Sequence, residues 1–212
     1  MVRCFVLVFA ISLAFEGHAR ADLIFGNPLT GSNLSGNPFT SGQTVNFNVT
    51  ATGIGRGSGI TENATNNRYN ATSWDTPAID TNAYFTFGIT PTAGAVITFD
   101  DFVYTGQASG TGPTAFAFRS NLDGFSSDIG TPTAAGATIS LAAPQFQSVS
   151  SAIEFRLYGW NASGGVGTFS VNDFSFNGSV TAVPEPSSIL LLGLAGASVG
   201  VGRRWRQKRL AV

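Results

Sequence analysis

Apolar and polar side chains alternate with a period of two in several short stretches of the chain. The alternation is plainest in residues 45–49, 85–89 and 153–157, where every second residue is Phe, Val, Ile or Leu. Successive side chains of a β-strand point to opposite faces, so these stretches predict strands with one buried face. Weaker patterns predict further strands at 96–104, 115–119 and 138–141. No window shows a convincing 3.6-residue period, and the pattern therefore favours an all-β fold.

A change of phase marks the last part of this region. Phe169 and Val171 share one alternation, whereas Phe174 and Phe176 share the other. An extra residue in a strand shifts the alternation by one position. A β-bulge at Asn172–Asp173 would therefore bring all four apolar side chains to one face.

Turn-forming residues separate the predicted strands. Gly, Pro, Asn, Asp and Ser cluster at 91–94, 109–113, 121–124 and 163–165. About eight short strands joined by such turns predict an antiparallel β-sandwich, with a jelly roll as the expected type. The longest stretch without a strand signal runs from about 53 to 83, and loops of that length are usually functional or disordered.

The N-terminus has the pattern of a signal peptide. Arg3 precedes an apolar run at 4–15, and Ala19 and Ala21 are small residues at the positions that signal peptidases read. Cleavage is therefore expected between Ala21 and Asp22. Residues 1–21 are then a signal peptide, and residues 22–182 form the β-sandwich domain.

The C-terminus, 183–212, has three parts in sequence. Val183, Pro184, Glu185 and Pro186 lie in a short polar segment, 183–188, where two prolines fix an extended backbone that cannot join a sheet or helix. An uncharged apolar segment follows at 189–202 and is expected to be a transmembrane helix. The basic tail at 203–212 should remain in the cytoplasm by the positive-inside rule. Its cationic residues are Arg203, Arg204, Arg206, Lys208 and Arg209.

This three-part tail resembles the PEP-CTERM sorting signal of Gram-negative bacteria, which is also called the ice-binding protein C-terminal domain. The resemblance implies an exosortase partner, an inner-membrane precursor and delivery to the cell surface or extracellular matrix. Residues 112–125, 155–160 and 171–178 also look like a recurrent exported β-sandwich of such protein sets, which tend to accompany exopolysaccharide and biofilm. No catalytic residue is implied. Ice binding is not expected, because no repeated Thr-x-Thr ladder is present.

Composition excludes several kinds of function. The only Cys and the only His, Cys4 and His18, both lie in the predicted signal peptide. The domain therefore has no disulfide, no Ser–His or Cys–His nucleophile and no His-bound zinc. Four arginines against ten acidic side chains leave residues 22–182 six charges negative, which disfavours nucleic-acid binding. Most of the acids lie in or beside turns, where local backbone bonding explains them, so no catalytic carboxylate pair and no enzyme are expected.

Asp100–Asp101 departs from the turn rule, because adjacent strand residues point to opposite faces and one carboxylate should point inward. The pair could ligate a hard cation, or mark a bulge or strand edge. First and last strands lie close in jelly rolls, so Asp22, Asp101 and Asp173 are the candidate ligands of a structural Ca²⁺. No other cofactor is expected.

Carbohydrate binding is the alternative function. Sugars are contacted by flat aromatic rings together with polar groups, and Trp74 lies in the long polar stretch. Tyr158 and Trp160 share a phase with Arg156, opposite Phe155. The same rings could instead form a second buried layer or cover the core edge. We expect Trp74 to be the exposed ring and Trp160 the more buried one.

Overall fold

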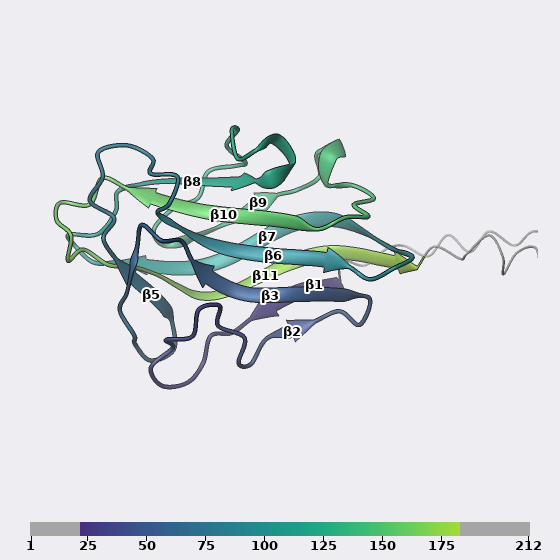
Figure 1. The fold of residues 1–212 in the computed structure, drawn as a ribbon, viewed down its shortest axis with the longest axis horizontal. Coiled ribbons are helices and arrows are strands. Elements are labelled where there is room, and N and C mark those ends of the chain that lie inside the picture. Colours follow the sequence, from purple (N-terminus) through teal and green to yellow (C-terminus); the bar gives the residue numbers. More distant parts are fainter. Residues whose placement is uncertain (1–21, 183–212) are drawn as a thin grey trace, which may run out of the picture.

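The computed structural model describes residues 22–182, which form two antiparallel β-sheets packed face to face (Figure 1). The larger sheet contains β1 (Asp22–Asn27), β2 (Thr44–Val45), β4 (Thr61–Glu62), β5 (Tyr69–Thr72), β7 (Ala95–Ala108), β9 (Gly136–Ser140) and β11 (Phe169–Ala182). The smaller sheet contains β3 (Val49–Arg56), β6 (Tyr84–Pro91), β8 (Ala115–Ser120) and β10 (Ile153–Trp160). Two 3₁₀ turns, η1 (Asn121–Asp123) and η2 (Pro144–Phe146), lie in the connections. The predicted all-β sandwich is confirmed.

β11 is the central strand of the larger sheet. It pairs with β7 along one edge, while β5 and β1 pair with successive parts of its other edge. The smaller sheet has the order β3-β6-β10-β8. From β6 onward, each strand lies in the opposite sheet from the strand before it. The expected closeness of first and last strands is confirmed, since Asp22 of β1 pairs with Gly178 of β11.

Two bulges adjust the pairing of β11 with β7. Val171 pairs with Gly106 and Asp173 with Thr105, which leaves Asn172 as an extra residue. The predicted bulge at Asn172–Asp173 is confirmed, and the phenylalanines on both sides of it reach the core. A second irregularity lies at Asp100, opposite the step between Asn177 and Gly178.

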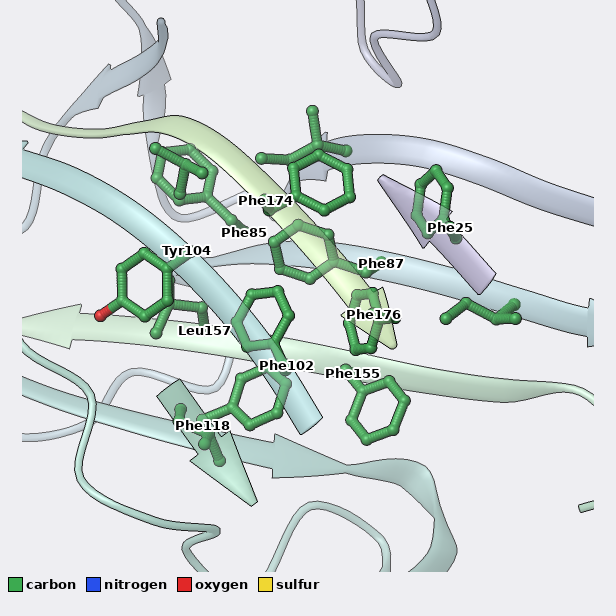
Figure 2. Close-up of a cluster of buried hydrophobic side chains, with 14 of the residues drawn as sticks. Phe25, Phe85, Phe87, Phe102, Tyr104, Phe118, Phe155, Leu157, Phe174 and Phe176 are labelled. Carbon is green, nitrogen blue, oxygen red and sulfur yellow. The ribbon is translucent and has the colours of Figure 1, made fainter. Parts of the chain in front are cut away.

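Phenylalanine dominates the space between the sheets (Figure 2). Phe176 lies near the centre, with ring centroids 4.5 Å from Phe102, 5.0 Å from Phe155 and 5.7 Å from Phe87. β6 supplies Phe87 and β10 supplies Phe155, because every second side chain of each strand is buried, while Phe102 comes from β7 and Phe176 from β11. With no cysteine in residues 22–182, this apolar packing is what stabilises the domain.

The predicted strand at 45–49 is wrong. β2 ends at Val45 and β3 begins at Val49, with a turn between them in which the Val49 amide donates to the Asn46 carbonyl at 3.0 Å. The Asn46 side chain accepts from the Asn48 amide at 3.1 Å, a local bond by which Asn competes with a strand ladder. Phe47 is consequently 87% exposed.

The predicted irregular stretch 53–83 is also wrong in part. It holds the end of β3 and all of β4 and β5. β4 and β5 have two and four residues, too few for a period-two pattern to stand out. β5 pairs with β11, far along the chain, and β4 pairs with β5, so no local pattern could reveal the two strands.

Other expectations lie outside the described residues. These are the signal peptide up to Ala21, the Pro-Glu-Pro segment, the transmembrane helix at 189–202 and the basic tail. Within residues 22–182, no helix is long and apolar enough to cross a membrane.

Candidate functional site

The outer face of the smaller sheet carries a cluster of aromatic and charged side chains. On β10, Ile153, Phe155 and Leu157 are buried in the core, whereas Glu154 and Arg156 alternate with them and are half-buried. β6 follows the same rule, so Tyr84 and Thr86 point to the outer face. Arg156 pairs with Thr86, and Tyr158 pairs with Tyr84. Two adjacent strands therefore present these side chains side by side.

Arg156 is held from three sides. Its guanidinium carbon lies 4.1 Å from the centre of the Tyr84 ring and 3.8 Å from that of Phe125, which comes from the loop after η1. Its Nε donates to Glu154 Oε1 at 2.7 Å, and the Thr86 hydroxyl donates to the same oxygen at 3.2 Å. A guanidinium between two rings and a carboxylate has little freedom, so this part of the face is preorganised.

The charges at this cluster are mutually stabilised. Burial alone would lower the pKa of Arg156, but hydrogen bonds to Glu154 and Tyr158 and the nearby negative charge of Glu154 outweigh it, so the pKa is raised. Burial raises the pKa of the Tyr158 phenol, while Arg156 partly opposes that shift. Arg156 is therefore cationic and Tyr158 neutral throughout the physiological pH range.

A shallow cavity of about 400 Å³ lies beside Arg156, over β3, β6 and β10. Gly55 and Gly88 form part of its floor, and a side chain at either position would crowd a neighbouring threonine. A Cβ at Gly88 would lie 2.9 Å from the Thr52 hydroxyl, and one at Gly55 would lie 2.9 Å from the Thr86 methyl. The two glycines therefore keep the floor open.

The cavity lining suits recognition of a polar ligand. It offers the Tyr84 ring, the hydroxyls of Thr52 and Thr86, and the Arg156–Glu154 pair. Its size falls within the usual range for small-molecule sites of roughly 300–1,000 Å³. Glu154 is the one carboxylate of the lining, and it is already bonded to Arg156. This arrangement can bind a ligand through the Tyr84 ring and the threonine hydroxyls.

The predicted exposure of the tryptophans is reversed. Trp74 is 0% exposed, packs edge-on against Phe85 and Phe169, and donates its Nε1 to the Ala71 carbonyl at 2.9 Å. A ring enclosed in the core cannot stack on a ligand, so the assignment of Trp74 to a binding site was wrong. The residues around Trp74 are polar and gave no sign that its ring is buried. Trp74 follows β5 directly, and the pairing of β5 with β11 brings the ring against Phe169.

Tyr158 and Trp160 lie on β10, as expected, but outside the cavity lining. Tyr158 is only 2% exposed and packs edge-on against Tyr84, with ring centroids 5.5 Å apart. It lies outside the main hydrophobic cluster, in agreement with the predicted phase. Trp160 is half-buried at the end of the strand. The residues that sequence reasoning missed are Tyr84 and Phe125, because only the strand register and a loop bring them to Arg156.

The three candidate calcium ligands are not brought together. Asp22 lies at the start of β1, and Asp101 of β7 pairs with Asn177 of β11. Asp173 lies four positions before Asn177 in β11 and pairs with Thr105. Asp101 accepts from the Asn177 amide at 2.7 Å, and Asp173 accepts from the Thr105 hydroxyl. No group of three or more His, Cys, Asp or Glu suited to a metal ion occurs in residues 22–182. Of the roles considered for Asp100–Asp101, a cation ligand, a bulge or a strand edge, the bulge agrees with the irregular pairing at Asp100.

Comparison with known proteins adds one finding. A family model described as the PEP-CTERM protein-sorting motif matches residues 182–207. The chain thus carries this sorting motif, and the predicted resemblance of the tail is confirmed. The motif implies processing by exosortase, export, and sorting through a membrane-anchored precursor in Gram-negative bacteria. No curated protein matches the chain.

Proposed function

We propose that this chain is a non-enzymatic component of the cell surface or extracellular matrix, associated with exopolysaccharide. One observation carries the proposal: the sorting motif begins at Ala182, the last residue of β11. The folded domain is therefore the cargo, and exosortase acts beside its final strand. The core of this cargo is apolar and residues 22–182 contain no cysteine, so the domain needs no disulfide chemistry after export.

The composition of the domain supports a passive role. The Ser, Thr, Asn and Gly of its surface are suited to hydrated polysaccharide, and its acidic excess keeps it soluble. The outer-face cavity beside Arg156 has a single carboxylate held in an ion pair, whereas glycoside hydrolysis requires two carboxyl groups. These features favour a structural protein over an enzyme.

Replacement of Pro184, Glu185 and Pro186 by alanine together should stop maturation. The substitutions leave the apolar segment unchanged, so insertion continues, but the extended strip that exosortase recognises is lost. We expect the tailed precursor to accumulate in the inner membrane. Fractionation and immunoblotting in an exosortase-bearing host measure this, with Ser187→Ala and Ser188→Ala as the control. Normal release of the triple variant would contradict the proposal.

The second candidate function is carbohydrate binding of the jelly-roll module type, favoured by the outer-face cluster of Tyr84, Phe125 and Arg156. Aromatic rings beside hydroxyls and a fixed ion pair are the usual chemistry of a sugar-binding face. The repeated passage of the chain between the two sheets is the kind of connection found in jelly rolls. This function is compatible with a matrix role.

If this cluster binds sugar, Tyr84→Ala should weaken glycan binding by about tenfold, since a desolvated ring contact is worth around 1–1.5 kcal/mol. A glycan array followed by titration of the strongest hit measures the effect. Phe47→Ala removes an exposed ring from a distant turn and is the matched control, expected to bind normally. Equal losses in the two variants, or binding to no glycan, would rule out the candidate function.

A further inference from the structure

Arg68 differs from the other arginines of residues 22–182 because no carboxylate pairs with it. The other three lie within 3.7 Å or less of a carboxylate oxygen: Arg56 of Glu62, Arg119 of Asp128 and Arg156 of Glu154. A half-buried cation without a counterion is unusual in a domain with ten acidic side chains. The residues around Arg68 therefore decide whether they form a site that could hold an anionic ligand.

Arg68 lines a pocket of about 260 Å³ on the outer face of the larger sheet. Three adjacent strands form the floor, because Asn70 of β5 pairs with Ser170 of β11, and Ser170 pairs with Gln107 of β7. Asn70 and Ser170 are only 6% and 2% exposed. The floor is thus a fixed row of polar side chains, built on strands and not on loops.

The hydrogen bonds of Arg68 leave one edge of its guanidinium unused. Nη1 donates to Gln107 Oε1 at 2.9 Å, which orients the group. Nε is buried and has no acceptor among the described residues. A buried donor on a charged group is costly without a partner. The Nε–Nη2 edge has the fork geometry that matches the two oxygens of a carboxylate.

The remaining lining contains hydroxyl and amide side chains and no acid. Asn63 and Thr65 come from the β4–β5 connection, Ser109 directly follows β7 and Thr168 directly precedes β11. Such groups bond sugar hydroxyls as donors and as acceptors. The negative charge of the whole domain acts at longer range and is screened beyond about 8 Å at physiological salt. A carboxylate in the pocket therefore interacts mainly with Arg68.

We propose that this pocket binds the carboxylate of an acidic sugar, a hexuronate, through Arg68. The carboxylate assignment rests on the pocket alone, whereas the sugar assignment rests also on the proposed association with exopolysaccharide. The pocket lies on the opposite sheet from the Arg156 cluster, so the two sites are independent.

Calorimetric titration of the full chain, purified in detergent, tests the proposal with sodium glucuronate, sodium acetate and glucose as probes. We expect saturable glucuronate binding, weaker acetate binding and no response to glucose. Arg68→Gln and Arg68→Lys should each reduce glucuronate affinity by about tenfold or more, because lysine keeps the charge but lacks the fork. Arg119→Gln removes the same charge from the other sheet and should leave the affinity unchanged.

Specific outcomes would overturn the proposal. Equal affinity for acetate and glucuronate would remove the sugar assignment, and an unchanged affinity in both Arg68 variants would remove the site. Melting curves of each variant establish that the fold is intact, and the lysine variant decides the matter if the glutamine variant is unstable. Because the sorting experiment does not involve Arg68, failure here leaves the proposed surface role unaffected, and failure of sorting leaves the pocket unaffected.

Discussion

Phe176→Ala should lower the free energy of unfolding of residues 22–182 by about 3–5 kcal/mol, the usual cost of removing a buried ring. Phe176 is 0% exposed and lies at the centre of the interface between the sheets (Figure 2). Its ring contacts Phe102 of β7 and Phe155 of β10, so its removal leaves a cavity that both sheets border. The rigid strand pairing around β11 limits how far the neighbours can close that cavity.

Urea denaturation measures this change, and Phe47→Ala is the matched control. Phe47 is 87% exposed in the β2–β3 turn, so the same substitution there should change stability by less than about 0.5 kcal/mol. A loss below about 1 kcal/mol at Phe176, or equal losses at both positions, would contradict the core described above.

Arg56→Ala should cost about 3–5 kcal/mol, although arginine is normally a surface residue. The Arg56 side chain is 3% exposed and its guanidinium lies 3.6 Å from the centre of the Tyr69 ring. Nε and Nη2 donate to the Asn70 carbonyl at 3.1 and 3.0 Å, and Nη2 also reaches the Leu34 carbonyl at 3.3 Å. Removing the side chain leaves buried carbonyls without donors and opens a space beside Tyr69.

The electrostatics of this cluster agree with a buried cation held by acceptors. Burial lowers the pKa of Arg56, and the nearby Tyr69 and Glu62 partly restore it. Burial also raises the pKa of Tyr69 to about 12, with Arg56 acting in the opposite direction.

The control for this prediction is Arg119→Ala, which removes a more exposed ion pair with Asp128 and should lower the free energy of unfolding by about 1 kcal/mol or less. Similar melting temperatures for the two variants would contradict the assigned role of Arg56.

Sequence patterns predicted the last six strands of the domain. β6, β7, β8, β9, β10 and β11 all lie where the pattern placed them, and the bulge at Asn172–Asp173 followed from the change of phase. The turn at Asn46 was misread, because an apolar residue between two asparagines imitates a strand. β4 and β5 could not be predicted, since β5 pairs with β11, about a hundred residues away, and β4 pairs only with β5.

The sequence predicted which side chains of β10 share the outer face, but not the neighbours that complete the candidate site. The alternation of β10 placed Arg156 opposite Phe155, but the contact with Tyr84 depends on the register between β6 and β10. Nothing in the local sequence fixes that register. The exposure of Trp74 was mispredicted for a related reason, because the polar segment around it was taken as exposed, whereas the fold buries the Trp74 ring in the core.

The position of β11 links the fold to its sorting. β11 is held by β1, β5 and β7, and it ends at Ala182, where the sorting motif begins. β1 starts at Asp22 and pairs with β11 near that same end (Figure 1). Any force on the tail is therefore borne by the most extensively paired strand of the domain.

Sorting by exosortase can be tested by comparing the intact mass and location of the chain in a producing host with and without its exosortase. With the enzyme, we expect a surface or matrix protein whose mass lacks the basic tail after the Pro184–Pro186 segment. Without the enzyme, we expect a full-length precursor in the inner membrane. The same mass and location in both strains would rule out sorting by exosortase.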